Sequence, residues 1–170
     1  VPSIVYGILG LAVFARALAL GQSVITAALT LALLVLPVII ISTREALRAV
    51  PRNIRDGSLA LGATEWQTAY RQTLPAAIPG IATGTILALS RAIGEAAPLL
   101  LLGAVSFITF NPDGVLSDYT TLPIQIFNWT KDSREEFQVL AAATIVVLLL
   151  ILLAMNFVAI WIRNKTQKRW

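Results

Sequence analysis

The uncharged stretch from Phe137 to Ile162 constrains the fold most, because it is long enough to cross the hydrocarbon core of a membrane. A second uncharged stretch, Ser23 to Ser42, also matches the core thickness of roughly 30 Å. Apolar runs of this length are the signature of membrane spans. Composition agrees: 57% of the residues are hydrophobic and only 13% are charged, whereas a soluble domain needs more charge to cover its surface.

The order of apolar and polar segments predicts one all-α transmembrane domain over residues 1–170. Its expected spans lie at about 4–20, 23–42, 76–104 and 137–162, with polar loops at 44–75 and 105–136. Arg16 interrupts the first span close to its end, where a long side chain can reach the membrane interface.

The charges of the two loops indicate the orientation. Loop 44–75 and the tail after Ile162 are rich in basic residues, whereas most of the charged residues in loop 105–136 are acidic. By the positive-inside rule the first loop and the tail are cytoplasmic and loop 105–136 is external. The net charge of +4 therefore reflects orientation in the cytoplasmic (inner) membrane and does not indicate nucleic-acid binding.

Several kinds of chemistry are excluded by missing residue types. The sequence contains no cysteine and no histidine, which excludes thiol catalysis, disulfides, zinc sites and histidine acid–base chemistry. It also lacks a phosphate-binding loop of the GxxxxGK[ST] kind, so the chain does not itself hydrolyse ATP. We therefore expect no catalytic residues, no metal and no cofactor in this chain.

The polar loop 44–75 is predicted to form two short helices that are separated at Gly62. Glycine suits a left-handed helix end, and Thr64 with Gln67 resembles a capping box that starts the second helix. Pro75 is expected to stop that helix. Such a hairpin needs an aqueous partner to bury its apolar side chains, unless it packs beneath its own membrane helices. These side chains are Leu59, Leu61, Trp66 and Tyr70.

Within the third expected span, Arg91 and Glu95 are four residues apart and can pair on one helix face. Gly80, Gly84 and Ala88 precede them at four-residue spacing, and small residues let helices approach closely. We therefore expect this face to point into a helix bundle, with the charged pair buried. A charged side chain exposed to lipid there would cost several kcal/mol.

Two interpretations of the pair remain open. Arg91 can line a substrate path, because a planar, permanently charged guanidinium binds two oxygens of a tetrahedral oxyanion. Glu95 would hold the guanidinium and moderate its charge, so that a bound anion can also leave. The alternative is an internal salt bridge that only locks helix packing.

The spacing of residues in the polar loop resembles the EAA motif of bacterial ABC-importer permeases. In that motif a triplet is followed by glycine six residues after its first position, and by Leu-Pro twelve residues after that glycine. The chain has Asp56-Gly57-Ser58, Gly62 and Leu74-Pro75 at these positions. The triplet departs from Glu-Ala-Ala, and Gln72 replaces the usual isoleucine.

Three further segments are similar to the PstA-type permeases of phosphate importers: Val1–Gly7 (VPSIVYG), Arg91–Leu99 (RAIGEAAPL) and Leu122–Trp129 (LPIQIFNW). The last is too short to span a membrane and is expected to be an interfacial or re-entrant helix. The resemblance covers essentially the whole chain. Such permeases usually have six spans, which implies that the first two helices are missing here.

The resemblance implies the fold of a type I ABC importer permease, with the polar loop as a cytoplasmic coupling loop. It implies a sister permease of the PstC kind, two PstB-like ATPase subunits that bind ATP, and a periplasmic PstS-like protein that delivers phosphate. The residues that would dock on an ATPase are Asp56, Gly57, Ser58, Leu59, Gly62, Trp66, Leu74 and Pro75.

Three alternatives remain. An ABC permease for sulfate, molybdate or an amino acid would carry the same coupling loop. An ion-coupled secondary carrier would use Arg91 and Glu95 as its coupling pair. Such a carrier is expected to contain internal repeats and to need no docking hairpin, whereas the sequence shows no internal repeat. A scaffold or assembly factor would leave the pair unexplained.

Overall fold

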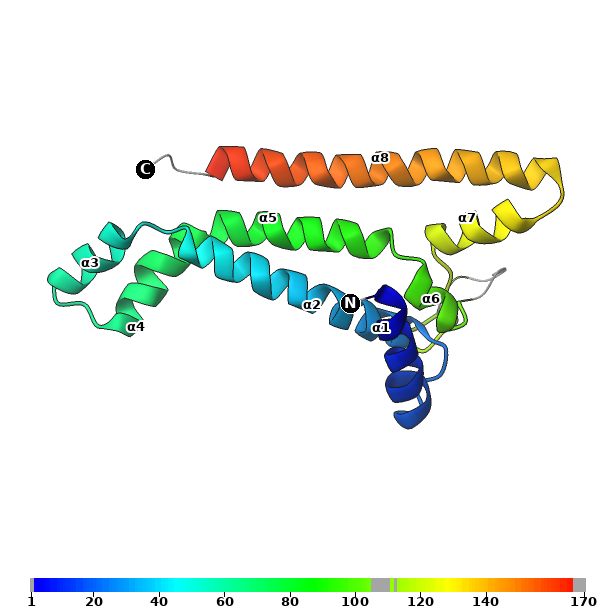
Figure 1. Cartoon of the computed structure of the whole chain (residues 1–170), viewed down its shortest axis with the longest axis horizontal. Coiled ribbons are helices and arrows are strands. Elements are labelled where there is room, and N and C mark those ends of the chain that lie inside the picture. Colours follow the sequence, from blue (N-terminus) through cyan, green and yellow to red (C-terminus); the bar gives the residue numbers. More distant parts are fainter. Residues whose placement is uncertain (1, 105–110, 112, 167–170) are drawn as a thin grey trace. The chain divides into compact units, whose positions relative to one another are not determined.

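The computed structural model describes residues 2–104, 111 and 113–166, and every regular element in this part of the chain is a helix (Figure 1). The predicted all-α class is therefore confirmed. Among the described helices, three are long and apolar enough to cross a membrane: α2 (Val24–Arg48), the continuous helix Glu65–Ile93, and α8 (Glu135–Thr166).

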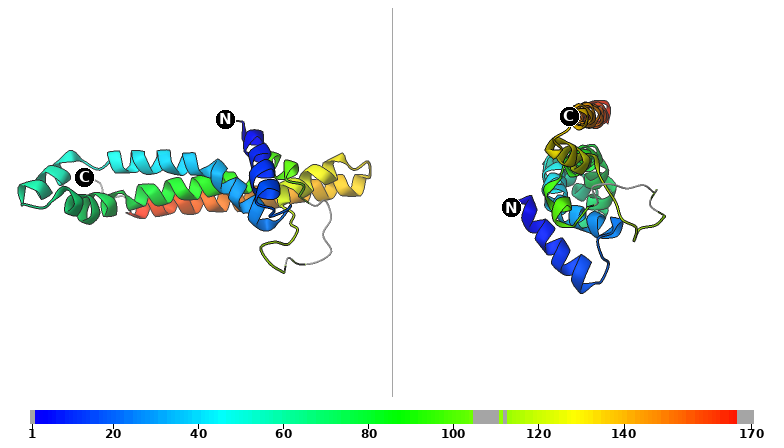
Figure 2. Two further views of the ribbon diagram at one scale, coloured as in Figure 1. Left: turned by 90° about the horizontal axis from the view of Figure 1, so that it is seen from below. Right: turned by 90° about the vertical axis from the view of Figure 1, so that its right-hand side faces the viewer.

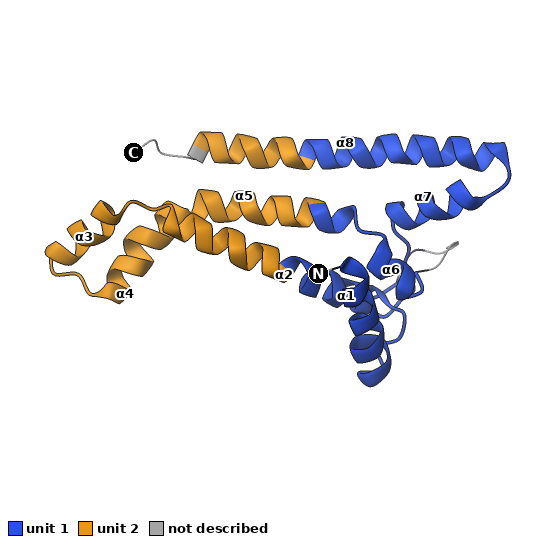
Figure 3. Ribbon diagram, in the orientation of Figure 1, with its two compact units in different colours: residues 1–35, 91–154 blue, residues 36–90, 155–170 orange. Residues whose placement is uncertain are grey.

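The chain divides into two compact units (Figure 3). Unit 1 comprises residues 1–35 and 91–154, and unit 2 comprises residues 36–90 and 155–170. Helices α2, α5 (Leu74–Ile93) and α8 each contribute residues to both units.

Unit 1 is built around a small apolar core. It contains α1 (Ser3–Gly10), the wider π-helix η1 (Leu11–Ala17), α6 (Ala97–Leu101) and α7 (Leu122–Lys131). Helix α1 packs on α6 so closely that a Cβ added to Gly7 would lie 2.8 Å from the Cα of Pro98. The buried core residues are Ala27, Leu99, Leu102, Tyr119 and Ile124. The expected short helix at LPIQIFNW is present as α7.

The first expected span, 4–20, is shorter in the structure. The helical segment runs from Ser3 to Ala17 and is shorter than the three spanning helices. It ends there because Ala19 and Gly21 have φ angles of 54° and 65°, and left-handed residues cannot continue a right-handed helix.

The third expected span, 76–104, is divided in two. Helix α5 ends at Ile93, and α6 begins at Ala97. Pro98 lies in the first turn of α6, where its missing N–H costs nothing. The pair of Gly94 and Pro98 is the sequence signal for this break.

Unit 2 contains the helical hairpin formed by the polar loop 44–75. Helix α3 (Arg52–Ala60) is followed by α4 (Glu65–Thr68), the π-helix η2 (Ala69–Thr73) and α5. The expectation that Pro75 stops the second helix is wrong, because α4, η2 and α5 form one continuous helix. The wider turns of η2 precede the proline, and Leu74 donates its N–H to the Ala69 carbonyl five residues back. Helices often accommodate an irregularity with such a π-type turn.

Candidate functional site

The turn of the hairpin is made at Gly62, which follows α3. Gly62 has a φ of 82°, a left-handed conformation that residues with a Cβ rarely adopt. Its N–H donates to the Leu59 carbonyl at 2.9 Å, and the Ala63 N–H donates to the Ser58 carbonyl at 3.2 Å. These two bonds form a Schellman motif. The predicted left-handed helix end at Gly62 is therefore confirmed.

The second arm of the hairpin starts at Thr64. The Gln67 N–H donates to the Thr64 Oγ1 at 3.2 Å, and the Thr64 N–H donates to the Gln67 Oε1 at 3.0 Å. This reciprocal arrangement is the predicted capping box. Glu65 in the first turn adds a favourable negative charge near the helix N-terminus. Local hydrogen bonds thus define both sides of the turn, and α3 and α4 lie side by side (Figure 2).

Two side-chain hydrogen bonds that sequence reasoning missed brace this hairpin. The Thr68 Oγ1 donates to the Ser58 Oγ at 2.9 Å, which joins the two arms. The Arg55 Nη2 donates to the Leu47 carbonyl at 2.7 Å, which ties α3 to the C-terminal turn of α2. The Thr68–Ser58 bond depends on the turn at Gly62, and the Arg55–Leu47 bond depends on the bend after α2. The hydroxyl residues on either side of Gly62 are the only sequence signal for the first bond.

The apolar side chains of the hairpin are uncovered in the part of the chain that the structure describes. Leu61 is 91% exposed, Trp66 78% and Tyr70 65%. The hairpin is thus not buried beneath membrane helices of the same unit. The rest of the predicted docking set is also exposed, except for the half-buried Ser58: Asp56, Gly57, Leu59, Gly62, Leu74 and Pro75.

The small residues of α5 lie against α2 within unit 2 (Figure 1). A Cβ added to Gly84 would lie 2.5 Å from both the Cβ and the Oγ of Ser42. One added to Gly80 would lie 2.8 Å from the Cβ of Ala46, and Ala88 is only 1% exposed. Each glycine therefore faces a small residue on α2. Close approach of this kind is typical of packed transmembrane helices.

Arg91 and Glu95 form an ion pair where α5 ends. The Arg91 Nε lies 3.5 Å from the Glu95 Oε1, and the two side chains are 61% and 17% exposed. Helix α5 closes with the Gly94 N–H donating to the Arg91 carbonyl, so Glu95 lies beyond its last residue. The expected deep burial of Arg91 is not seen among the described residues. The pair instead presents an exposed guanidinium that a largely buried carboxylate holds from one side.

Two titratable groups in the segment 113–136 have shifted pKa values. Burial raises the pKa of Tyr119 to about 12, so its phenol is neutral in the core of unit 1. Hydrogen bonds from Arg134 hold the pKa of Asp132 at about 2. The Arg134 Nη2 lies 2.9 Å from the Asp132 Oδ2, and the Arg134 Nε donates to the Oδ1 at 3.0 Å. This exposed pair is charged at neutral pH and lies before the first turn of α8.

The described part of the chain combines three helices of membrane-spanning length with an exposed, capped hairpin and an ion pair at a helix end. The family described as "binding-protein-dependent transport system inner membrane component" matches residues 1–168. The chain belongs to this family. It is a multi-pass protein of the inner (cytoplasmic) membrane, with the α-helical fold of ABC-importer permeases. Members of the family are membrane permease subunits and are not themselves enzymes.

Curated relatives agree with the family. The chain is 34% identical to the probable ABC transporter permease protein YqgI of Bacillus subtilis, over 99% of this chain and 61% of the relative. It is 32% identical to the phosphate transport system permease protein PstA 1 of Mycobacterium tuberculosis (strain H37Rv), over 99% of this chain and 54% of the relative. It is 39% identical to the phosphate transport system permease protein PstA of Mycobacterium leprae, over 75% of this chain and 41% of the relative.

Nearly the whole chain aligns with YqgI and with PstA 1, but it spans only 61% and 54% of their lengths. No solved structure matches the chain.

Proposed function

We propose that this chain is a permease subunit of an ATP-driven importer that moves inorganic phosphate across the cytoplasmic membrane by alternating access. The observation that carries the proposal is the Arg91–Glu95 pair, in a chain whose relatives include permeases named for phosphate transport. The chain performs no covalent chemistry. Its task is to offer the anion a different affinity in two conformational states.

The geometry of the pair suits transient binding of an oxyanion. The contact to Glu95 uses the Arg91 Nε, and the two Nη groups have no hydrogen-bond partner among the described residues. A guanidinium can donate two parallel hydrogen bonds to two oxygens of a phosphate. Glu95 keeps the guanidinium in place and offsets part of its charge, which prevents the anion from being held too tightly for release.

The hairpin is the part through which an ATPase would drive the transport cycle. Its turn is held by the Gly62 backbone bonds and the Thr64 cap, and the Ser58–Thr68 bond joins its arms. A braced hairpin transmits a displacement as a rigid body, and its exposed Leu61 and Trp66 supply an apolar contact surface. We infer that the predicted docking residues enter a groove of an ATPase subunit.

The remaining partners follow from the same proposal. A PstC-like sister permease would complete the substrate path, two PstB-like ATPase subunits would bind ATP, and a periplasmic PstS-like protein would deliver phosphate. The family description, which specifies binding-protein-dependent transport, supports the delivery protein. The names of the relatives support phosphate as the substrate.

Uptake of labelled phosphate tests the substrate. Cells that carry the gene with its partner subunits are compared with and without excess sulfate and molybdate. We expect uptake that resists both competitors. Uptake that either competitor blocks would point instead to a permease for another oxyanion.

The same assay tests the pair. Arg91→Ala should lower uptake roughly 10- to 150-fold, because charge-assisted hydrogen bonds contribute about 1.5–3 kcal/mol. Assembly with the ATPase subunits, measured by copurification, should be unchanged. Arg16→Ala is the matched control, because it removes another exposed arginine of unit 1. Normal uptake by Arg91→Ala would show that the pair is only structural.

Glu95→Gln separates the two members of the pair. We expect a milder loss than for Arg91→Ala, since glutamine has nearly the same size as glutamate and its amide oxygen can accept a hydrogen bond from the Arg91 Nε. An equal loss in both variants would show that the intact salt bridge is the essential unit, and that Arg91 alone does not bind the anion.

A further inference from the structure

A groove in unit 2 has no part in the proposed transport path, and Leu59 is the one predicted docking residue among those that line it. It lies between the end of α2, helix α3 and the start of the helix Glu65–Ile93, and its volume is about 840 Å³. Part of its wall is apolar, supplied by Ile39, Ile40 and Leu47 of α2 and by Leu59 of α3. Ile40 is 56% exposed. The groove therefore offers an open apolar surface.

The same groove has an excess of positive charge. Arg44, Arg48 and Arg55 line it, and Glu65 is the single carboxylate among the lining residues. Arg48 forms an ion pair with Glu45, but the Arg48 Nη1 lies 3.6 Å from the Glu45 Oε1 and both side chains are 60% exposed. An exposed pair of this kind contributes little, so Arg48 can engage another anion.

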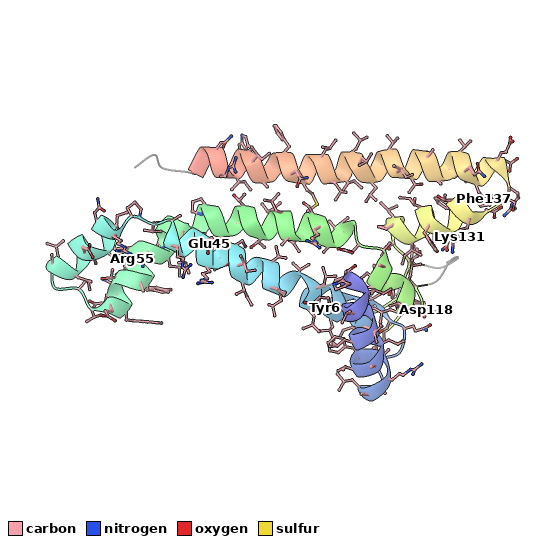
Figure 4. The ribbon with its side chains drawn as sticks, viewed as in Figure 1. Tyr6, Glu45, Arg55, Asp118, Lys131 and Phe137 are labelled. Atoms are coloured by element: carbon pink, nitrogen blue, oxygen red, sulfur yellow. The ribbon has the colours of Figure 1, made fainter. Side chains whose placement is uncertain are left out.

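Arg55, which is labelled on the hairpin in Figure 4, lines the groove and has an unsatisfied donor. Its Nη2 donates to the Leu47 carbonyl, whereas its Nε is buried and has no hydrogen-bond partner among the described residues. Buried polar atoms without partners are rare in native proteins, and a nearby water or ion is one physical explanation for them.

The position of the groove along α2 shows what kind of molecule would fill it. The uncharged run of this spanning helix reaches Thr43, and Arg44 is its first charged residue. Ile39 and Ile40 therefore lie at the level of the hydrocarbon, and Arg44 and Arg48 lie at the boundary with water. A molecule that matches both ends must be apolar at one end and anionic at the other.

We propose that this groove binds an anionic glycerophospholipid of the cytoplasmic leaflet. Arg44 and Arg48 hold its phosphate, and an acyl chain lies on Ile39 and Ile40. Basic pockets at this side of membrane helices attract anionic headgroups. Free phosphate would leave the apolar wall uncovered, and a lipid without net charge would leave the arginines uncompensated. The proposal does not depend on which anion the importer transports.

Lipid binding by the purified complex of this chain with its partner subunits tests the proposal. After delipidation in detergent, the complex is titrated with phosphatidylglycerol or with phosphatidylcholine of the same acyl chains, and bound lipid is measured by mass spectrometry. We expect tighter binding of phosphatidylglycerol. Arg44→Gln combined with Arg48→Gln should weaken it about 25-fold, because one basic residue near an anionic headgroup contributes roughly 5-fold.

Arg52→Gln combined with Arg71→Gln is the matched control. It removes the same charge from the same unit, but neither residue lines this groove. Phosphatidylglycerol binding by the control should stay within about twofold of the wild type. An equal loss in both double variants would reduce the effect to diffuse charge and overturn the site.

Three other results would also overturn the proposal. Equal binding of phosphatidylcholine would mean that the groove selects only for apolar chains, and displacement by inorganic phosphate at equal concentration would mean a free-phosphate site. Crosslinking of Thr43→Cys to a partner subunit would mean that a protein fills the groove. Should the glutamine variant not assemble, the wild-type complex is titrated in rising NaCl. Charge-mediated binding then weakens, and salt-independent binding counts against the site.

Discussion

Gly62 in the hairpin and Gly84 in α5 belong to the same unit, but they are glycines for different reasons. Gly62 has a φ of 82°, and a Cβ added to it would meet nothing within 4 Å. Gly84 has no such backbone requirement, but its added Cβ would lie 2.5 Å from Ser42. The hairpin thus depends on local backbone conformation, and the pairing of α2 with α5 depends on space. The two regions should respond differently to the same kind of substitution.

The largest effect is expected where space is the constraint. Gly84→Leu should destabilise the chain by about 1–3 kcal/mol, because added atoms in a packed contact force backbones apart. The thermal unfolding midpoint of the complex in detergent measures this. Gly84→Ala should be milder, and adding Ser42→Gly should recover part of its loss, because the pair shares one contact. Strictly additive effects of Ser42→Gly and Gly84→Ala would contradict the packing contact.

The next effect concerns backbone conformation. Gly62→Val should cost about 1–2 kcal/mol, because a left-handed residue with a Cβ is strained. The strain should open the hairpin and reduce copurification of the ATPase subunits. Gly62→Asn is the control, because asparagine tolerates this conformation better. If Gly62→Val retains normal ATPase binding and transport, the docking assignment of the hairpin is wrong.

The capping box sharpens the comparison, because its effect should stay within the hairpin. Thr64→Ala removes the acceptor for the Gln67 N–H and should destabilise the second arm by about 1 kcal/mol. Amide hydrogen exchange should rise in residues 65–68 and stay unchanged around the contact of Gly84. Thr64→Ser should preserve both readouts. Faster exchange in both regions would show that the two are not independent.

The smallest effect has the opposite sign. Gly57 lies inside α3, and a Cβ added there would meet nothing within 4 Å. Gly57→Ala should therefore stabilise the helix by about 0.5–1 kcal/mol, since glycine loses more backbone freedom on folding than alanine. A small rise in the unfolding midpoint is the expected result. A fall would mean that something contacts Gly57 in the assembled complex.

Predictions that rested on short-range hydrogen bonding agree with the structure. The left-handed turn at Gly62 and the cap at Thr64 each involve residues a few positions apart, so residue type and spacing were enough to indicate them. The prediction that Pro75 ends the second helix was wrong, because the effect of a proline depends on the turns before it. Here the π-helix η2 lets the helix continue. The end of the first span also departed from prediction, at Ala19, whose positive φ has no signal in residue type.

The candidate sites divide in the same way. The i, i+4 spacing of Arg91 and Glu95 predicted their ion pair, whereas the exposure of the Arg91 side chain did not follow from that spacing. The groove beside Arg44 and Arg55 could not be predicted, because its walls come from α2, α3 and the helix Glu65–Ile93. Its convergence depends on how these helices pack.

By itself, the sequence determined that this chain is an all-α membrane protein, where its charges lie, and that a capped turn separates α3 from α4. Each of these depends on hydropathy or on bonds between near neighbours in the chain. Only the tertiary structure decided that Gly84 meets Ser42, that Thr68 bonds to Ser58, and that Arg55 reaches the Leu47 carbonyl. These contacts join separate helices, and their geometry depends on the packing of whole elements.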